Sequence, residues 1–385
     1  TTEESTTERE SGRLLLVVTV GWILLFSYLL LITNDYLPKP GGIQQYLGNL
    51  VERYDGPIQV IAPKDKTADR DAQVVRNKRK FMWPTRKTRA WVEEQASRFN
   101  PDVVLFGAPY PLPTMGPALR ESLGVPYGVI AHGAEVTVPA AFPGARQLLA
   151  GPLKQADVVF ANSRWTAGKV ERITKRDVTH LGIGVDLDSY RPVDGRWSDE
   201  VVVGCVSRFI PRKGHAEVLH AVAELRASGH KVRAMIVGRG RLEGRLRKVA
   251  EALDVPVDFH VDIPWSELPM RYREMDIFAM PCRNRWLGLE QEGLGIVFLE
   301  AAATGLPVIA GASGGAPETV LPGKSGFVVH DRDGLVEALQ MLVSDPIRAK
   351  HMGEAGRSFM ERAHSWDSVM ERLRSGLELA VKNAS

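Results

Sequence analysis

The stretch between residues 288 and 305 constrains the fold and the function of this chain most strongly. A glycine-rich turn, Gly293 to Gly295, precedes an apolar run typical of a helix, and Glu292 and Glu300 stand eight residues apart around it. That spacing predicts two carboxylates near one side of the element, the first at its entrance, beside backbone N–H groups that favour anionic or hydroxyl-rich ligands. Because a carboxylate accepts hydrogen bonds from neighbouring sugar hydroxyls, the pair suits a nucleotide sugar. An ordinary amphipathic helix with two solvated acids has the same spacing, so the surrounding motifs decide.

The rest of the chain indicates a globular α/β protein with two domains. At 385 residues it is too long for one typical core. With 44% apolar and 25% charged residues, the composition excludes disorder for most of the chain, and a net charge of +3 is too small to imply nucleic acid. Cys205 and Cys282 both stand in apolar, strand-like contexts, which indicates buried thiols in a reducing cytoplasm. Two cysteines cannot form a zinc site alone.

The N-terminal segment allows two structural interpretations. Residues 1–12 are polar and acidic and predict a disordered tail, whereas residues 14–33 carry no charge and are long enough for a transmembrane helix. A first buried strand at residues 28–33 competes for the same run and leaves only about fourteen apolar residues, too few to span a bilayer. We favour the strand, with residues 14–27 packing on the domain or touching lipid. A spanning anchor and a start assigned upstream of the true one stay open.

Several strand-like segments end at residues suited to ligand binding, as in open α/β sheets, where sites lie at the carboxyl ends of strands. Gly41 and Gly42 follow the first such segment, and paired glycines let the backbone approach a phosphate closely. His132 and Gly238 also follow strands. A lone histidine or a glycine turn is more often structural, so the position at a strand end is what indicates a site.

Two basic segments accompany these turns. Arg208 and Lys213 frame a strand-to-helix turn, where fixed cations suit a diphosphate. Between residues 74 and 92 the chain has no acid and interleaves aromatic residues with seven cations, which are Arg76, Lys78, Arg79, Lys80, Arg86, Lys87 and Arg89. A solvated basic surface is the plain alternative, and nucleic acid would need a recognition motif that does not accompany the patch. Aromatic residues among the cations favour an anionic membrane surface, where each cation contributes about 1 kcal/mol.

Taken in order, five blocks resemble the signature of the family-four retaining glycosyltransferases, which have the GT-B fold. They are Gly41-Gly42-Ile43, His132-Gly133-Ala134-Glu135, Ser207 to Gly214, Val237 to Gly240, and Glu292 to Ile296 with Phe298-Leu299-Glu300-Ala301. Within that family, Asn34 to Pro38 and Ile309 to Thr319 are similar to the actinobacterial phosphatidylinositol-mannoside mannosyltransferases of the PimB type. This chain has Ala134 where the family often has histidine, which leaves open what that position contributes to acceptor choice.

The resemblance implies two Rossmann-like domains facing across a cleft. The expected segments are a tail and extension at 1–27, an acceptor domain at 28–192, a nucleotide-sugar domain at 199–365, and a helix at 366–385 that crosses back to the first domain. An Asp-x-Asp pair, Asp186 and Asp188, chelates metal in other glycosyltransferases, but here it precedes the interdomain linker and we interpret it as structural. We therefore predict no metal and no cofactor beyond the donor substrate.

The resemblance also implies roles for individual residues in transfer with retention. Arg208 and Lys213 would stabilise the leaving diphosphate, His132 would orient the hexose, Glu292 would hold hexose hydroxyls and Glu300 the ribose. The remaining donor contacts are expected from Gly41, Gly42, Gly238, Gly293, Leu294, Gly295 and Ile296. Acceptor contacts are expected from Gln44, Arg79 and Lys80.

The best interpretation is transfer of mannose from GDP-mannose to a phosphatidylinositol mannoside. The enzyme would be cytoplasmic, bound peripherally to the inner face of the plasma membrane, with no nucleic-acid partner and an undetermined oligomeric state. A family-four enzyme that uses a UDP-sugar is the alternative. A sugar-nucleotide epimerase, which shares the two-domain architecture, and a non-catalytic nucleotide-sugar binder are the rivals outside the class.

Overall fold

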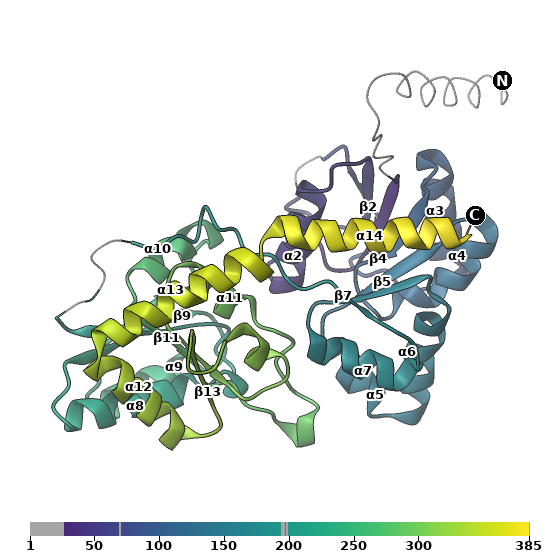
Figure 1. Cartoon of the computed structure of the whole chain (residues 1–385). Coiled ribbons are helices and arrows are strands. Elements are labelled where there is room, and N and C mark those ends of the chain that lie inside the picture. Colours follow the sequence, from purple (N-terminus) through teal and green to yellow (C-terminus); the bar gives the residue numbers. More distant parts are fainter. Residues whose placement is uncertain (1–26, 69–70, 194–196, 198, 385) are drawn as a thin grey trace, which may run out of the picture.

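The computed structural model describes residues 27–68, 71–193, 197 and 199–384, so the predicted tail and almost all of the predicted apolar extension lie outside the described residues. Figure 1 shows two lobes, each built around its own parallel sheet flanked by helices. The predicted fold class, two Rossmann-like α/β domains, is therefore confirmed. Within the described ranges, no helix combines the length and apolar character needed to cross a bilayer.

The N-terminal domain is a seven-stranded sheet in the order β3-β2-β1-β4-β5-β6-β7. Its strands are β1 (Leu29–Ile32), β2 (Ile58–Ala62), β3 (Val74–Arg76), β4 (Val103–Phe106), β5 (Tyr127–Ala131), β6 (Val158–Ala161) and β7 (Thr179–His180). β1 pairs in parallel with β2 on one side and β4 on the other, with Leu29 opposite Ile58 and Val103. All four residues of β1 are fully buried, because a central parallel strand is covered on both faces. The strand predicted at residues 28–33 is confirmed.

Alternating side chains of β1 divide the N-terminal core into two layers. Leu30 and Ile32 face a cluster that contains residues of α3 (Arg86–Phe99), α4 (Gly116–Leu123), α6 (Pro143–Gln155) and α7 (Arg164–Thr174). Leu29 and Leu31 face the opposite cluster, which contains residues of α2 (Gly42–Glu52) and α14 (Trp366–Ala384). Two further short helices complete this domain, η1 (Leu112–Met115) and α5 (Ala134–Ala140).

The C-terminal domain is a six-stranded parallel sheet in the order β10-β9-β8-β11-β12-β13. Its strands are β8 (Val201–Val206), β9 (Val232–Gly238), β10 (Val257–Val261), β11 (Ile277–Met280), β12 (Val308–Gly311) and β13 (Gly326–Val329). Its α-helices are α8 (His215–Ala227), α9 (Glu243–Ala252), α10 (Leu268–Arg273), α11 (Ile296–Ala303), α12 (Arg332–Ser344) and α13 (Pro346–Ala363). Short 3₁₀ turns are η2 (Pro211–Lys213), η3 (Trp265–Glu267), η4 (Trp286–Gly288) and η5 (Ala316–Thr319).

The last helix joins the two domains. In Figure 1, α13 lies along the C-terminal domain and α14 runs across the N-terminal one. Trp366, at the start of α14, packs its ring 5.7 Å from that of Tyr46 in α2. Further along, Arg374 pairs with Asp55 at 2.7 Å. The predicted helix that crosses back to the first domain is confirmed.

Candidate active site

The predicted site residues lie on loops that leave the carboxyl ends of the parallel strands. His132 directly follows β5, Ser207 directly follows β8, and Gly238 is the last residue of β9. Gly41 is the N-cap of α2, the helix that follows β1. The turns from one sheet meet those from the other where the domains contact. In open α/β sheets, ligands bind at this edge.

A buried ion cluster forms the centre of the site. Glu292 Oε2 accepts a hydrogen bond from Lys213 Nζ at 2.7 Å and another from Arg212. All three side chains are about nine-tenths buried. Burial alone would raise the pKa of the Glu292 carboxyl, but the neighbouring charges of Lys213 and Arg212 hold it well below its usual value. Glu292 is therefore ionised, and Arg212 also pairs with Glu290 at 3.6 Å, so the two cations face two carboxylates.

The cluster adds a residue that the sequence analysis missed and omits one that it named. Arg212 was not singled out, although it lies in the same motif block as Lys213. Arg208, predicted beside Lys213 on the diphosphate, is exposed and does not belong to the buried ion cluster. Its role on the donor stays a prediction. The 3₁₀ turn η2 explains the difference, since it directs consecutive residues Arg212 and Lys213 into the protein.

The glycine-rich turn after Glu292 lies closer to the other domain than its sequence indicated. Helix α11 begins at Ile296 with Gly295 as its N-cap at φ 90°, so Gly293 and Leu294 precede the helix. The carbonyl of Gly293 accepts a hydrogen bond from Ser163 Oγ at 3.0 Å. A Cβ atom at Gly293 would collide with the carbonyl oxygen of His132. Only glycine permits this approach, which joins the acidic loop to the histidine across the domain boundary.

Glu300 lies inside α11, only 3% exposed, between two tyrosines. Tyr272 of α10 donates to Oε2 at 2.7 Å, and Tyr190 of the interdomain segment donates to Oε1 at 3.0 Å. Burial raises the pKa of Glu300 to about 6, although both hydrogen bonds act to lower it. Neither tyrosine could be predicted, because 28 and 110 residues separate them from Glu300. Its contact with ribose stays a prediction.

His132 is held in one orientation. Its ring Nε2 lies 2.8 Å from the carbonyl oxygen of Gly107, and because a carbonyl only accepts, Nε2 carries the hydrogen. The backbone N–H of His132 donates to Glu135 at 2.6 Å, and its carbonyl accepts from Asn162 at 3.0 Å. The ring packs edge-on against Tyr46 at 5.6 Å. Nδ1 is then the nitrogen that can accept a hydrogen bond from a ligand hydroxyl.

Gln44, which was predicted to contact the acceptor, belongs to a small polar network. Its Nε2 donates to Asp35 Oδ1 at 2.7 Å, and Lys39 pairs with the same oxygen at 3.0 Å. Gln44 is 7% exposed, and its side chain packs against Gly41. A Cβ atom at position 41 would collide with the side-chain oxygen of Gln44. Asp35 was missed as a site residue, although its block after the first strand was noted.

The basic segment between β3 and α3 is anchored at one buried residue and exposed around it. Met82 exchanges backbone hydrogen bonds with the side chain of Asn34, at 2.8 and 3.1 Å, which ties the segment to the end of β1. Arg79 and Lys80 are exposed beside it. Phe81 and Trp83 flank Met82 with their rings 4.9 Å apart, 40% and 53% exposed.

A second contact across the domains involves Glu318 of η5. Its two carboxylate oxygens accept from the backbone N–H groups of Arg164 and Trp165, at 2.8 and 2.6 Å. These groups open helix α7, so the carboxylate lies at the positive end of the helix dipole. This contact, called the clasp below, joins the C-terminal domain to the N-terminal one beside the Ser163–Gly293 hydrogen bond.

The Asp-x-Asp pair, Asp186 and Asp188, makes hydrogen bonds within its own turn. Asp186 accepts from the backbone N–H groups of Asp188 and Ser189 and from the Ser189 hydroxyl at 2.7 Å. Among the residues that the structure describes, no group of three His, Cys, Asp or Glu side chains is placed to hold a metal. Metal independence stays a prediction.

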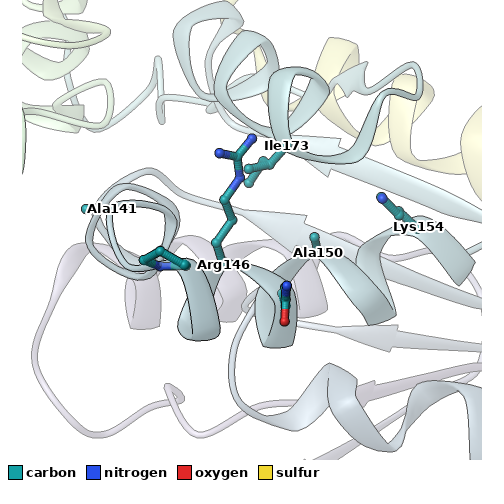
Figure 2. A pocket seen from close by; sticks show the side chains of 7 residues that line it. Ala141, Arg146, Ala150, Lys154 and Ile173 are labelled. Carbon is teal, nitrogen blue, oxygen red and sulfur yellow. The ribbon is translucent and has the colours of Figure 1, made fainter.

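A cavity of about 440 Å³ lies at α6 and the end of α7, apart from these residues. Figure 2 shows Arg146 and Lys154 among the apolar side chains of Ala141, Ala150 and Ile173. Its lining holds two cations, no carboxylate and no predicted donor residue. Glu292 and Glu300, the carboxylates predicted to accept sugar hydroxyls, do not line this cavity, and their role on a donor stays a prediction.

Comparison with known proteins agrees with this geometry. Residues 40–189 match the family described as Glycosyltransferase Family 4, and residues 188–359 match Glycosyl transferases group 1. The GDP-mannose-dependent alpha-(1-6)-phosphatidylinositol monomannoside mannosyltransferase of Mycolicibacterium smegmatis is 38% identical over 372 residues, covering 90% of this chain and 97% of that protein. The monoacylated-substrate counterpart from Corynebacterium glutamicum is 36% identical over 372 residues, covering 91% and 97%.

Solved structures share the fold at low sequence identity. Sucrose-phosphate synthase from Thermosynechococcus elongatus superposes with a TM-score of 0.76 at 19% identity, covering 93% of this chain and all of that one. The Anabaena HepE protein in complex with UDP and glucose superposes with a TM-score of 0.73 at 18% identity, covering 91% and 99%. The chain is a glycosyltransferase and belongs to family four, whose GT-B fold it has.

Proposed function

We propose that this enzyme transfers mannose from GDP-mannose, with retention of configuration, to a phosphatidylinositol mannoside at the cytoplasmic face of the plasma membrane. The observation that carries the proposal is the buried Arg212–Lys213–Glu292 cluster, which Gly293 brings against His132 of the other domain. Cations for a diphosphate, a carboxylate for sugar hydroxyls and an oriented histidine then converge at one place. The mycobacterial and corynebacterial relatives supply the identity of donor and acceptor.

In this proposal the ion cluster is a preformed diphosphate site. Lys213 and Arg212 are buried and already aimed at one carboxylate oxygen, so little ordering is needed when the donor binds. The diphosphate competes with Glu292 for these cations, and the carboxylate released from them accepts hydrogen bonds from the hexose. In the transition state the cations stabilise the leaving diphosphate, an effect worth about 3 kcal/mol for one such donor.

Glu300 holds the nucleoside end of the donor. Each carboxylate oxygen already accepts one tyrosine hydroxyl and has lone-pair capacity for one ribose hydroxyl. Because the pKa of Glu300 is raised to about 6, the carboxylate is ionised at neutral pH and protonates in mildly acidic solution. Donor binding should therefore weaken below about pH 6, where the protonated group loses acceptor capacity.

The chemistry needs no nucleophile from the protein. The bond between the anomeric carbon and the phosphate oxygen breaks with its electron pair moving to the leaving diphosphate. The acceptor hydroxyl attacks from the same face, and its proton passes to an oxygen of that diphosphate. His132 orients the hexose through Nδ1, since Nε2 is committed to the carbonyl of Gly107.

The acceptor enters from the N-terminal domain. Gln44 and its partner Asp35 offer polar groups for an inositol or mannose hydroxyl, and Arg79 and Lys80 offer charge to lipid phosphates. The exposed rings beside them suit the headgroup layer, where aromatic residues gather. Peripheral association with an anionic leaflet follows from these groups.

A donor-dependent thermal shift tests the proposal. A ligand that binds only the folded state raises its stability with the logarithm of saturation. GDP-mannose should raise the melting temperature of the wild type, and the rise should vanish in Glu300→Ala and Lys213→Ala. A rise with UDP-glucose instead would support the UDP-sugar alternative, and turnover of donor without acceptor would support the epimerase. No rise with any nucleotide sugar would contradict the donor site itself.

A further inference from the structure

A short loop of the C-terminal domain presents two large apolar side chains to solvent. Trp286 is 68% exposed, and Leu287 next to it is wholly exposed. Both belong to η4, between the end of β11 and Glu292. Isolated exposed apolar residues need no explanation, but two large neighbours at one loop tip form a feature that water disfavours.

The backbone of this tip adopts a conformation that residues with a Cβ atom avoid. Trp286 and Leu287 both lie in the left-handed region, at φ 53° and 52°. Such single residues are unusual outside glycine and asparagine, and two consecutive large residues more so. Strained backbone of this kind gathers at binding and catalytic sites, where the surrounding structure holds it.

Hydrogen bonds at the base of the tip hold that conformation. Arg285 and Glu290 exchange backbone bonds at 3.0 and 3.2 Å, and the N–H of Leu289 donates to the carbonyl of Trp286 at 3.1 Å. Hydrogen bonds therefore close the turn at its base, and its tip faces solvent. It presents Trp286 and Leu287 instead of packing them into the core.

The base of the same loop is fixed to the active site and to the acceptor domain. Thr137 of α5 donates to the carbonyl of Leu289 at 3.2 Å, across the domain boundary. Ser313 donates to Asn284 at 2.8 Å and accepts from the backbone N–H of Glu292 at 3.1 Å. An occupant of the tip would therefore lie at the junction of the domains, a few residues from the sugar site.

We propose that Trp286 and Leu287 insert into the lipid surface that carries the acceptor, which gives the donor domain a membrane contact of its own. The inference rests on the proposed lipid acceptor. It adds a membrane contact on the donor domain to the one proposed for the basic segment of the N-terminal domain.

The chemistry of the tip favours a bilayer over a protein partner. The guanidinium of Arg285 lies 5.4 Å from the ring centre of Trp286, and Arg283 is 55% exposed at its side chain. Tryptophan beside arginine suits the boundary between acyl chains and anionic headgroups. Glu290 pairs with Arg285 at 3.4 Å and Glu217 pairs with Arg283 at 3.5 Å, so these carboxylates partly neutralise the two arginines. A stable protein interface needs roughly 1,000 Å² of complementary surface, far more than two side chains on a narrow tip provide.

Vesicle binding tests the inference without any enzymatic assay. Vesicles of phosphatidylcholine and phosphatidylinositol are floated with the wild type and with Trp286→Ser/Leu287→Ser. Burial of two such side chains predicts a partition coefficient at least about tenfold lower in the variant. Ile347→Ser and Met270→Ser are matched controls, because these residues are 70% and 55% exposed elsewhere on the domain. An unchanged partition coefficient in the double variant, or an equal fall in the controls, would overturn the inference.

Two further measurements separate this inference from the proposed function. Brominated lipids should quench tryptophan fluorescence in the wild type, and the quenching should fall in Trp286→Phe; equal quenching in both proteins overturns the insertion. Transfer to a deacylated, water-soluble acceptor should be the same in Trp286→Ser/Leu287→Ser and the wild type, while transfer to the acylated acceptor in vesicles falls. Equal falls with both acceptors would show that the loop acts on the donor site instead. A wild type that transfers no mannose at all refutes the proposed function, whereas flotation still decides the role of the tip.

Discussion

The tyrosine pair on Glu300 makes the sharpest prediction about donor binding. Tyr272→Phe removes one hydroxyl and leaves the ring, so the packing of α10 against α11 is kept. The lost hydrogen bond, 2.7 Å long and buried at both ends, is made to an ionised carboxylate. Such bonds contribute about 1.5–3 kcal/mol. Its loss stabilises the protonated form of Glu300 relative to the ionised one.

The size of the effect follows from the pKa. At the lower end of that range, the pKa of Glu300 rises from about 6 to about 7, because 1.36 kcal/mol corresponds to a tenfold change in the ionisation constant. At pH 6 the ionised fraction then falls from about one half to about one tenth, so donor affinity falls about fivefold. At pH 8 more than about nine-tenths is ionised in both proteins, and the affinities converge.

Calorimetric titration of GDP-mannose between pH 5.5 and 8.5 measures this shift. Tyr127→Phe is the matched control, because it removes a buried hydroxyl that donates to the neutral carbonyl of Pro152 at 2.6 Å in the other domain. The control should lose stability without moving the pH profile. If Tyr272→Phe loses stability but its profile coincides with that of the wild type, Glu300 does not bind the donor as a carboxylate.

Three further predictions concern the cluster, the clasp and the basic segment. Lys213→Ala should lower kcat/KM about hundredfold or more, from a loss of about 3 kcal/mol of transition-state stabilisation, while the exposed Lys350→Ala changes nothing. Equal rates in steady-state assays would exclude the diphosphate role. Glu318→Gln keeps one acceptor oxygen at the start of α7 and loses the charge, which should weaken this contact between the domains by about 1 kcal/mol. Small-angle scattering should then show a larger radius of gyration than in the wild type, and an unchanged profile would contradict the role of the contact. Arg79→Gln/Lys80→Gln should bind anionic vesicles about tenfold or more weakly, with Lys350→Gln as the control, and undiminished binding would remove these residues from the membrane surface.

Local patterns predicted the fold because parallel sheets leave local traces. The end of the uncharged run at residues 14–33 forms β1, Leu29–Ile32, which is apolar throughout because it is covered on both faces, whereas residues 14–26 lie outside the described residues. The glycine turns after strands could be predicted from the sequence. Gly293 allows the close approach of its backbone to His132, and Gly295 adopts the left-handed conformation of the helix N-cap.

The partners of the acidic residues could not be predicted in this way. Tyr190 and Tyr272 reach Glu300 from distant segments, and their spacing follows no helical or strand period. Arg212 stood in a recognised motif, but only the η2 turn shows that it points inward with Lys213. Long-range contacts of this kind depend on how the elements pack, which a single sequence does not display.

The most direct test of the account is transfer of radiolabelled mannose from GDP-mannose to phosphatidylinositol monomannoside in vesicles, with the anomeric configuration of the product determined by NMR. A retaining mannosyltransferase should give an α-linked lipid product, depend on both substrates, and show a rate about hundredfold lower in Lys213→Ala. Labelled product from UDP-glucose or UDP-N-acetylglucosamine but not from GDP-mannose would contradict it, as would a product of inverted configuration.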